Sequence, residues 1–474
     1  MATSRDKRFT TPLLDRFPWG RAPFFVMVTA VISVVLRVVT AGHGHKRPDL
    51  ILVTHAEPHY DAYLKLIPEF ERQHGVEVQL QLANWASLQS RLQNAFLAGV
   101  DTPDVAELFE GSLGFFTRGR VDDFAVLDLT ERLRAEGLFE RLAESRYSLW
   151  SARGRIYGLP RDVHPVMLAY RRDLVAQLGI DVRTLDTWEK FVAIGRSITR
   201  DLNGDGVIDR YMMDLRYDGS WALNTLMLQR EGQFFDSDGN AAFATEDVVE
   251  LIHWYLLQTR GPNKIAYDAG WGQVAAKALS DGLVLFVFTP DWRSGMLEHE
   301  APSLKGKMAL MPLPAWKPGG RRTSVWGGTG IVIMKGCAHP DLAWELIKFL
   351  YFRTEGVDKI FAETNVLPSL KQAWTLPELE APDAYYSDQR IGRMYAALAS
   401  QTPSINSSPV DPYARLKLAE AYSRSAVYYD SHGENGLGDF IRRALADGAA
   451  DVQRMASRDH RLEAARDWRA TAND

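Results

Sequence analysis

The sequence predicts an α/β fold, in which a mainly parallel sheet carries helices on both faces. The first observation is the alternation of short apolar runs with amphipathic stretches between residues 49 and 111. The second is the length of 474 residues, which exceeds what one hydrophobic core usually supports. The third is a composition of 46% hydrophobic and 24% charged residues, which is typical of a folded soluble protein. We therefore expect at least two globular domains.

Three strands and two helices open the predicted sheet. A short apolar or alternating run marks each strand, and a 3.6-residue period marks each helix. In chain order they are the strand "DLILVTHA" (49–56), the helix "YDAYLKLIPEFERQHG" (60–75), the strand "VEVQLQLA" (76–83), the helix "SLQSRLQNAFLAG" (87–99) with Ser87 as its N-cap, and the strand "PDVAELFEG" (103–111). Because helices that connect parallel strands cover both faces of a sheet, this order predicts a parallel sheet.

Ligand-binding residues are expected where these strands end. In open parallel sheets, ligands sit beyond the carboxyl ends of the strands. The residues at these ends are His55, Ala56, Glu57, Asn84, Trp85, Glu110 and Gly111. The sequence therefore predicts that these residues surround one mouth.

The rest of the chain continues in the same way, without a repeat of fixed period. The main predicted elements are a helix capped at Thr187, a helix pair around "DSDGN" (236–240), an apolar strand "LVLFVF" (283–288), two strands within 307–314 and 323–336, and the helix "PDLAWELIKFLYF" (340–352). A loop that carries Asp291 and Trp292 is expected after the apolar strand. The remainder of the chain is predicted to be helical.

The amino terminus has the pattern of a targeting segment. Residues 1–21 form a charged region, and residues 24–36, "FFVMVTAVISVVL", carry no charge. This order is typical of a secretory signal, and "VTA" (39–41) offers a small residue for cleavage. Arg37 interrupts the run and could instead snorkel to the interface beside a retained anchor. We predict export, with 22–41 a signal sequence or a membrane anchor; a core helix is the third alternative.

Charge and motifs exclude several classes of function. The net charge of −5 argues against a nucleic-acid binder, because phosphate contacts require a basic surface. Cys337 is the only cysteine, which excludes an intramolecular disulfide and a CxxC-type metal or redox site. No GxSxG, HExxH or Walker motif occurs, and the dispersed histidines lack metal-ligand spacing. A glycoside hydrolase with two carboxylates across a cleft is the rival enzyme hypothesis.

The loop "DLNGDGVID" (201–209) has the start of a calcium-binding pattern. The candidate ligands, at positions one, three, five, seven and nine of an EF-hand, are Asp201, Asn203, Asp205, the carbonyl of Val207, and Asp209. Met212 stands where an EF-hand has its bidentate glutamate. Asp and Asn also stabilise metal-free turns by accepting backbone hydrogen bonds. The two alternatives are a structural calcium site and a metal-free scaffold, and no other cofactor is expected.

Five stretches occur in an order that resembles the extracellular solute-binding proteins of ABC importers, in particular the sugar-binding group that includes maltose-binding proteins. They are "YDAYLKLIPEFERQHGVEVQ", "LQSRLQNAFLAGVDTPDVAEL", "GRIYGLPRDVHPVMLAYRRDLVAQLGI", "LSDGLVLFVFTPDW" and "GGTGIVIMKGCAHPDLAWELIKFL". The resemblance runs from about Asp49 to about Tyr351 and more diffusely to about Arg454. Members of this group often carry an acidic loop like 201–209 at the same place.

The resemblance implies two α/β lobes, each a central sheet flanked by helices, joined by crossing hinge segments whose rotation closes the lobes over a ligand. The implied domains are a charged region 1–21, a signal sequence or anchor 22–41, the first lobe 49–158, the second lobe 159–289, a return to the first lobe 290–335, carboxyl-terminal helices mainly of the second lobe 336–455, and a charged tail 456–474.

Sugar recognition requires flat aromatic rings against the C–H faces of a pyranose and planar polar groups for its hydroxyls. The candidate rings are Trp85, Trp271, Trp292 and Trp326. The candidate polar partners are Glu57, Glu110, Arg161, Asp162 and Asp291, and Gly327 and Gly328 would let a ligand approach the backbone. For each ring the alternative is packing in a core, and for each polar group it is a solvated loop.

One stretch departs from the pattern of the group. "THAEPHYD" (54–61) stands where many sugar binders carry a tryptophan, so His55, His59 or Tyr60 could replace that ring. We predict an exported monomer, in the periplasm or on the extracellular face of the cytoplasmic membrane, that captures an oligosaccharide or glycoside between its lobes. It would deliver the sugar to ABC permease subunits and perform no catalysis. The alternatives are a membrane-anchored sensor and a binder of a non-sugar solute.

Overall fold

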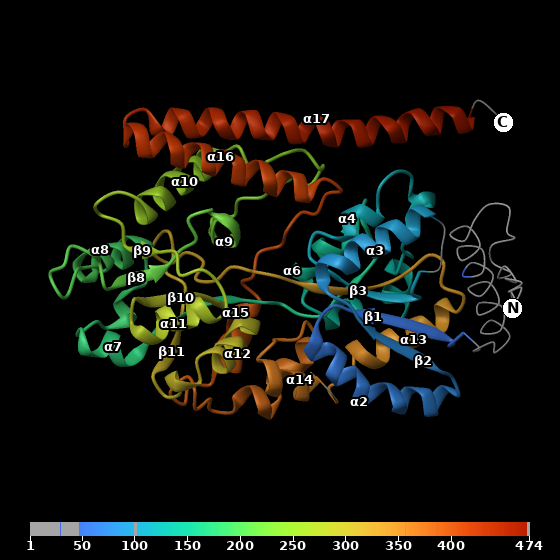
Figure 1. Ribbon diagram of the computed structural model, residues 1–474. Coiled ribbons are helices and arrows are strands. Elements are labelled where there is room, and N and C mark those ends of the chain that lie inside the picture. The colour runs from blue at the N-terminus through green and yellow to red at the C-terminus, as the bar shows by residue number, and fades with distance from the viewer. Residues whose placement is uncertain (1–28, 30–46, 99–101, 356, 472–474) are drawn as a thin grey trace, which may run out of the picture. The chain divides into compact units, whose positions relative to one another are not determined.

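Two five-stranded sheets organise the chain in the computed structural model, which describes residues 29, 47–98, 102–355 and 357–471. Residues Leu50–Asp474 form one compact unit. The first sheet has the strand order β2-β1-β3-β12-β6, and the second has the order β11-β7-β10-β8-β9. We call each sheet with the helices packed on it the first lobe and the second lobe (Figure 1). The predicted signal or anchor, 22–41, lies outside the described residues apart from Thr29.

The first lobe confirms the predicted parallel arrangement. Its elements are β1 (Leu50–Thr54), α2 (Glu57–His74), β2 (Val78–Leu82), α3 (Trp85–Ala98), β3 (Val105–Phe109), α4 (Leu113–Phe116), α5 (Thr130–Ala135), α6 (Glu144–Tyr147), β4 (Ser151–Ala152), β5 (Arg155–Ile156), β6 (Leu159–Pro160), β12 (Thr329–Ile333) and α13 (Pro340–Tyr351). Strand β1 runs parallel to β2 and β3, and β12 pairs antiparallel with β3 and β6. Helix α2 begins at Glu57, before the predicted start at residue 60, because Pro58 is well suited to a first helical turn.

The second lobe is mixed, with antiparallel and parallel pairs. Its elements are β7 (Val166–Arg171), α7 (Arg172–Gln177), α8 (Trp188–Ile198), β8 (Tyr211–Asp214), α9 (Ser220–Gln229), α10 (Glu246–Thr259), β9 (Ala266–Tyr267), α11 (Gln273–Asp281), β10 (Val284–Pro290), α12 (Asp291–Glu300), β11 (Met308–Pro312), α15 (Ile391–Ala399), α16 (Asp411–His432) and α17 (Leu437–Thr471). Helix α14 (Val357–Thr364) packs against α2 of the first lobe and α12 of the second. Thr187 caps α8 as predicted, its hydroxyl accepting the Lys190 N–H.

Alternating side chains place a hydrophobic layer on each face of the second sheet. In β7, Val166, Leu168 and Tyr170 belong to one buried cluster, whereas Met167 and Ala169 belong to another. The first cluster includes residues of α8, α10, α16 and α17, and the other includes residues of α11, α12 and α15. Figure 1 shows α16 and α17 lying side by side as an antiparallel helical hairpin. A sheet buried on both faces explains why β7 and β10 read as continuous apolar runs.

Three crossing segments, 161–165, 313–328 and 365–370, lie between the lobes. The Val166 N–H donates to the Ser324 carbonyl at 3.1 Å, and the Val163 N–H donates to the Leu367 carbonyl at 3.1 Å. Pro165 and Val325 also form an isolated antiparallel bridge. The segments therefore run side by side, as expected of a hinge.

The structure differs from the predicted elements and boundaries in four places. Strand β11 pairs with β7 of the second sheet, so the return to the first lobe begins after Pro312 and not at residue 290. Helix α13 packs in the core of the first lobe, whereas α16 and α17 lie on the second lobe as predicted. Asp291 and Trp292 open helix α12 instead of a loop, because Pro290 and Asp291 suit a helix start. Residues 456–471 of the predicted charged tail are part of α17, which extends to Thr471.

Candidate ligand-binding site

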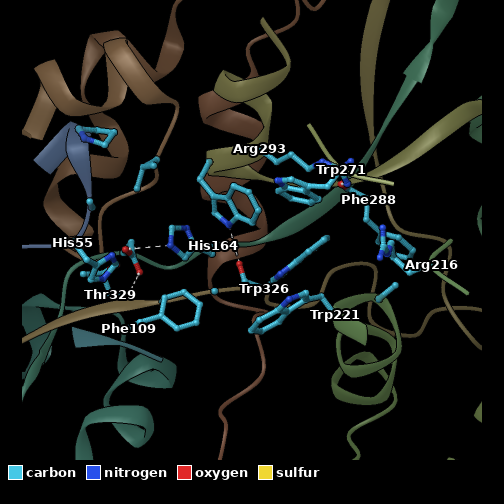
Figure 2. A pocket seen from close by; sticks show the side chains of 18 of the residues that line it. His55, Phe109, His164, Arg216, Trp221, Trp271, Phe288, Arg293, Trp326 and Thr329 are labelled. Atoms are coloured by element: carbon cyan, nitrogen blue, oxygen red, sulfur yellow. Dashed lines mark hydrogen bonds and ion pairs between the residues drawn. The ribbon is translucent and has the colours of Figure 1, made fainter. Parts of the chain in front are cut away.

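A cavity of about 660 Å³ lies where the two lobes and the crossing segments meet (Figure 2). This volume falls within the range of roughly 300–1,000 Å³ that is typical of small-molecule sites. Four tryptophans line it: Trp221, Trp271, Trp292 and Trp326. Aromatic rings from the second lobe and from a crossing segment therefore face one space.

The four rings are neighbours of one another. The Trp326 centroid lies 5.6 Å from Trp292, 6.1 Å from Trp271 and 6.4 Å from Trp221. The planes of Trp221 and Trp326 differ by only 18°, whereas Trp292 stands edge-on to Trp326 at 86°. Trp271 is 48% exposed and Trp221 is 36% exposed, so much of their ring surface is open to a ligand.

Hydrogen bonds orient two of these rings. Trp292 is the second residue of α12, and its backbone N–H donates to the side chain of Asp291 at 2.8 Å. The indole Nε1 of Trp292 donates to the backbone carbonyl of Trp326 at 2.9 Å. The Trp326 N–H in turn donates to the carbonyl of His164 at 3.4 Å. The start of α12 and two crossing segments thus position Trp292 and Trp326 together.

A buried cluster of charges lies beside the tryptophans. His164, held at a φ of 58°, places Nδ1 2.6 Å from Asp291 Oδ1 and Nε2 3.1 Å from Asp162 Oδ2. Burial by itself lowers the pKa of His164, but the two carboxylates raise it to about 10. His164 is therefore a cation at neutral pH. Although burial opposes it, this cation holds the pKa of Asp162 below its usual range.

A second buried ion pair supports Trp271. Arg293 places Nη2 3.8 Å from Asp214 Oδ2, and its Nη1 donates to the Phe288 carbonyl at 2.7 Å. The guanidinium carbon lies 4.9 Å from the centroid of the Trp271 ring, within cation–π distance. Burial raises the pKa of Asp214 and lowers the pKa of Arg293, and the charge of each partner opposes the shift of the other.

The first lobe contributes a smaller wall with His55, His59 and Phe109. The rings of His55 and Phe109 have centroids 6.0 Å apart, and Phe109 lies 6.1 Å from Trp221 of the second lobe. Aromatic contacts therefore run across the space between the lobes. Burial lowers the pKa of His55, so this ring is neutral at pH 7.

The structure brings nine of the residues predicted from sequence into the lining. They are His55, Ala56, His59, Trp271, Trp292, Trp326, Asp162, Gly327 and Gly328. Gly327 has a φ of 98°, which favours glycine, and a Cβ on Gly328 would lie 2.6 Å from Nη2 of Arg146. The crowded backbone explains why two glycines follow Trp326.

Four of the candidate polar partners are not among the described lining residues. Glu57 is exposed at the start of α2, and Trp85 begins α3 with a side chain that lies outside those described. Asp291 is fully buried against His164. The strand-end rule places these residues near the mouth but does not fix the direction of each side chain.

The other two predicted polar residues are buried in neighbouring contacts. Glu110 has its Oε1 3.8 Å from Nη1 of Arg415, which lies on α16. The guanidinium of Arg161 lies 5.1 Å from the centroid of the Tyr351 ring. Both side chains therefore support the walls of the first lobe and do not face the cavity.

Several lining residues were not found from the sequence: Phe109, His164, Asp214, Trp221 and Arg293. Phe109 is the last residue of β3 and directly precedes the predicted Glu110. Because successive side chains of a strand point to opposite faces, the prediction selected the neighbour of the lining residue. Trp221 was assigned only to a helix, and Arg293 only to the surroundings of Asp291. No local signal showed that these helices present the two side chains to the cavity.

The acidic loop 201–209 does not line the cavity. Asp201 accepts the backbone N–H groups of Gly204 at 2.6 Å and Gly206 at 2.7 Å, and these bonds hold its pKa below the usual range. Asp209 accepts the Leu202 N–H at 2.8 Å. In the described part of the chain, no group of three or more His, Cys, Asp or Glu side chains is arranged to hold a metal ion. Structural calcium in this loop stays a prediction.

Comparison with known proteins places the chain in a family. The profile of bacterial extracellular solute-binding proteins matches residues 56–354. The arabinooligosaccharide-binding protein of Halalkalibacterium halodurans is 23% identical over 373 residues, which cover 77% of this chain and 81% of that protein. The lactose-binding protein of Rhizobium radiobacter is 25% identical over 339 residues, which cover 68% of this chain and 74% of that protein.

Solved structures share the fold. The sugar-binding protein MalE from Xanthomonas citri has a TM-score of 0.70 at 17% identity, covering 86% of this chain and 98% of that one. The maltose/maltodextrin-binding domain MalE from Bdellovibrio bacteriovorus, bound to maltotriose, has a TM-score of 0.63 at 19% identity, covering 85% of this chain and 99% of that one. These likenesses confirm the two-lobed α/β fold predicted from the sequence.

The family match is broad. It begins just after β1 and includes every other strand of the two five-stranded sheets and the crossing segments 161–165 and 313–328, and thus more than half of the chain. None of the described helices has the length and apolar character that a membrane span requires. This chain belongs to the family of bacterial extracellular solute-binding proteins.

Proposed function

We propose that this protein binds a sugar, an oligosaccharide or a glycoside, in the cavity between its lobes. The observation that carries the proposal is the set of four tryptophan rings around one cavity. Aromatic rings pack against the apolar C–H faces of a pyranose, and a few polar groups then fix its orientation. Relatives named for arabinooligosaccharides and lactose support a saccharide ligand.

Polar groups for the hydroxyls stand at the edges of this aromatic lining. Arg216 and Asp218 face the cavity, with Arg216 Nη2 3.2 Å from Asp218 Oδ2. A planar guanidinium and a carboxylate can each bind two neighbouring hydroxyls at once. The tryptophans would therefore supply contact area, and such groups would select among sugars.

The buried carboxylates near the cavity are paired with cationic side chains, which supports a binding role without catalysis. Glycoside hydrolysis needs two carboxyl groups that can reach the glycosidic bond as acid and as base or nucleophile. Asp162 and Asp291 are bound to His164, and Asp214 is paired with Arg293. These side chains stabilise the walls of the cavity, and the protein performs no reaction on its ligand.

The proposed role is capture of the sugar outside the cytoplasm and delivery to an ABC permease. A ligand that touches both lobes favours their closed arrangement by its higher affinity for that state. The permease would then recognise the closed lobes. Export through residues 22–41 and a monomeric carrier are parts of this proposal.

Thermal unfolding of the full chain tests the sugar assignment. The panel contains arabinotriose, lactose, maltotriose, mannobiose, single amino acids and polyamines. A ligand that binds only the native protein stabilises it by about 2.7 kcal/mol at one hundred times its Kd. We expect at least one saccharide to raise the Tm, and no amino acid or polyamine to do so.

A ring-removal variant locates the site. Trp326→Ala removes a central ring but keeps the backbone carbonyl that the Trp292 indole uses, and we expect about 30-fold weaker binding. Tyr428→Ala on α16, outside the cavity lining, is the control and should bind like the wild type. A Tm shift with an amino acid or polyamine alone would overturn the sugar assignment but keep the solute-binding role. No shift with any solute would favour the sensor alternative.

A further inference from the structure

One buried carboxylate of the first lobe accepts hydrogen bonds from four side chains. Glu107 on β3 accepts the Thr54 hydroxyl at 2.5 Å, the Tyr63 hydroxyl at 2.6 Å and the Tyr351 hydroxyl at 2.7 Å. Its Oε2 also lies 3.0 Å from Nδ1 of His59. Burial opposes ionisation, but these donors, with His59 foremost, hold the pKa of Glu107 far below its usual range. Glu107 is therefore an anion that can only accept hydrogen bonds.

This carboxylate determines which nitrogen of His59 carries the proton. Because Glu107 only accepts, Nδ1 of His59 must donate. In the neutral ring Nε2 is then an unprotonated acceptor. His59 is only 3% exposed yet lines the cavity.

His55 presents a second acceptor to the same wall. The ring is hydrogen-bonded to the backbone of Leu108, and its Nε2 is buried with no hydrogen-bond partner among the described residues. Figure 2 shows His55 at the first-lobe end of the cavity. Burial lowers the pKa of His55 and outweighs the carboxylates of Glu107 and Asp162, which raise it. A buried acceptor without a partner is costly unless a ligand supplies the donor.

We propose that His55 and His59 recognise ligand hydroxyl groups through unprotonated Nε2 atoms, and that Glu107 is a positioning residue that fixes the proton of His59 on Nδ1. The inference rests on the proposed sugar-binding function and deepens it. Two acceptors beside an anionic carboxylate favour hydroxyl donors and disfavour a carboxylate group at this wall. The site is therefore selective for neutral sugars over uronic acids.

The first experiment measures affinity by titration calorimetry on the full chain, with the panel saccharide that gives the largest Tm shift. His55→Phe keeps a ring but removes the acceptor, and we expect about tenfold weaker binding. His55→Gln retains a polar atom near the position of Nε2 and should recover most of the loss. His432→Phe replaces an exposed histidine of α16 and should bind like the wild type.

The dependence of binding on pH distinguishes recognition from packing. A neutral ligand on the His55 ring favours its unprotonated form, so wild-type affinity should fall as the pH drops below about 6.5. Glu107, His59 and Asp162 are the other titratable groups near this ring. His55→Phe should bind with a flatter pH profile. Equal affinities and equal profiles for the wild type and His55→Phe would overturn the proposal.

The role of Glu107 in placing the His59 proton is tested by measuring directly which imidazole nitrogen carries it. Imidazole ¹⁵N resonances of the histidine-labelled full chain should show both rings protonated on Nδ1, with the Nε2 signals shifting when the saccharide binds. Glu107→Gln can donate to His59 and should move its proton to Nε2. Glu107 accepts hydrogen bonds from four side chains, so this variant could unfold. The spectrum of the wild type therefore decides the test. Nε2-protonated rings in the wild type would contradict the proposal.

The two proposals fail in distinguishable ways. If no saccharide of the panel binds, the sugar-binding function itself is overturned. If a saccharide binds and Trp326→Ala weakens it while His55→Phe does not, only the histidine inference is overturned. Galactose against galacturonate is the matched pair for charge, and stronger binding of galacturonate would also overturn it.

Discussion

Two histidines face the same cavity in opposite charge states. His55 lies in the wall of the first lobe, where burial lowers its pKa. His164 lies in a crossing segment between the lobes, where Asp162 and Asp291 overcome burial and raise its pKa to about 10. Both rings are largely buried, so burial alone does not determine the charge. The number of carboxylates in direct contact does.

The difference in charge matches two different roles, ligand binding for His55 and stabilisation of the hinge for His164. A neutral imidazole can accept a hydrogen bond from a hydroxyl group at the wall of the first lobe. A cation bound by two carboxylates instead joins segments 161–165 and 365–370 with the start of α12, since Asp291 also accepts the Leu367 N–H at 2.6 Å. The positive charge of His164 therefore serves to hold the hinge segments together.

The largest expected effect comes from removing one carboxylate of the hinge. Asp291→Ala leaves a buried His164 with one partner and the Leu367 N–H without its acceptor. Breaking a buried pair on one side costs about 3–5 kcal/mol, so we expect a loss of this size in the free energy of unfolding by denaturant. Asp281→Ala, which removes the surface partner of Lys277, should cost less than about 1 kcal/mol. Equal losses in the two variants would mean that the charge cluster is not structural.

The next effect is a loss of stability at alkaline pH. The pKa of His164 is raised above its unfolded value of 6.5, so its contribution is complete below pH 6.5 and disappears as the pH rises through about 10. Asp162 has a lowered pKa, so its contribution is lost in acid instead. Unfolding free energies measured from pH 6 to 10 should decline, and His164→Gln should flatten the decline. A profile that is equally steep in His164→Gln would assign the effect to other groups.

A third prediction concerns the space available beside the buried Arg146. A Cβ on Gly328 would lie 2.6 Å from Nη2 of Arg146, the buried arginine that donates to the Gly327 carbonyl. Overpacking of this kind costs about 1–3 kcal/mol, so Gly328→Ala should lower the unfolding free energy. Gly438→Ala adds a methyl group to α17 in open space and should cause no loss. If both variants were equally stable, Arg146 would have room to move.

The smallest effect concerns carboxylates that are exposed. Asp201 holds its loop by backbone hydrogen bonds, so Asp201→Ala should lower the Tm by less than about 2 °C in the presence of a chelator. If the loop binds calcium, added calcium will raise the wild-type Tm and leave that of Asp201→Ala unchanged. Calcium-independent melting of the wild type would leave the loop as a scaffold. The small loss of stability expected for this exposed carboxylate can be compared with the large loss expected for the buried Asp291.

The fold was largely predictable because its strands are local apolar or alternating runs. Strands β1, β2 and β3 with their helices followed from two periods and from the rule for parallel connections. The place of β11 was not predictable in this way, because an edge strand joins β7 by antiparallel pairing across a long stretch of chain. Pairing of that kind depends on tertiary contacts and leaves no local period.

The site was predictable in position more than in composition. Trp271, Trp292 and Trp326 were found because they lie near strand ends or glycines, where ligands approach the backbone. Phe109, Trp221 and Arg293 were missed because the direction of a side chain depends on how its strand or helix packs. His55 was predicted both at a strand end and as a replacement for a ring, whereas His59 was predicted only as a replacement. The hydrogen bonding of His59 depends on Glu107, which lies 48 residues away along the chain.

The bond between the Trp292 indole and the Trp326 carbonyl has an evolutionary consequence. Its donor is a side chain, but its acceptor is a backbone atom that every residue at position 326 would offer. Position 326 can therefore exchange its ring for another and alter the choice of sugar without breaking this contact. A substitution of Trp292 removes the indole donor and thus breaks the bond. Among relatives that differ in sugar specificity, we therefore expect substitutions at position 326 before substitutions at position 292.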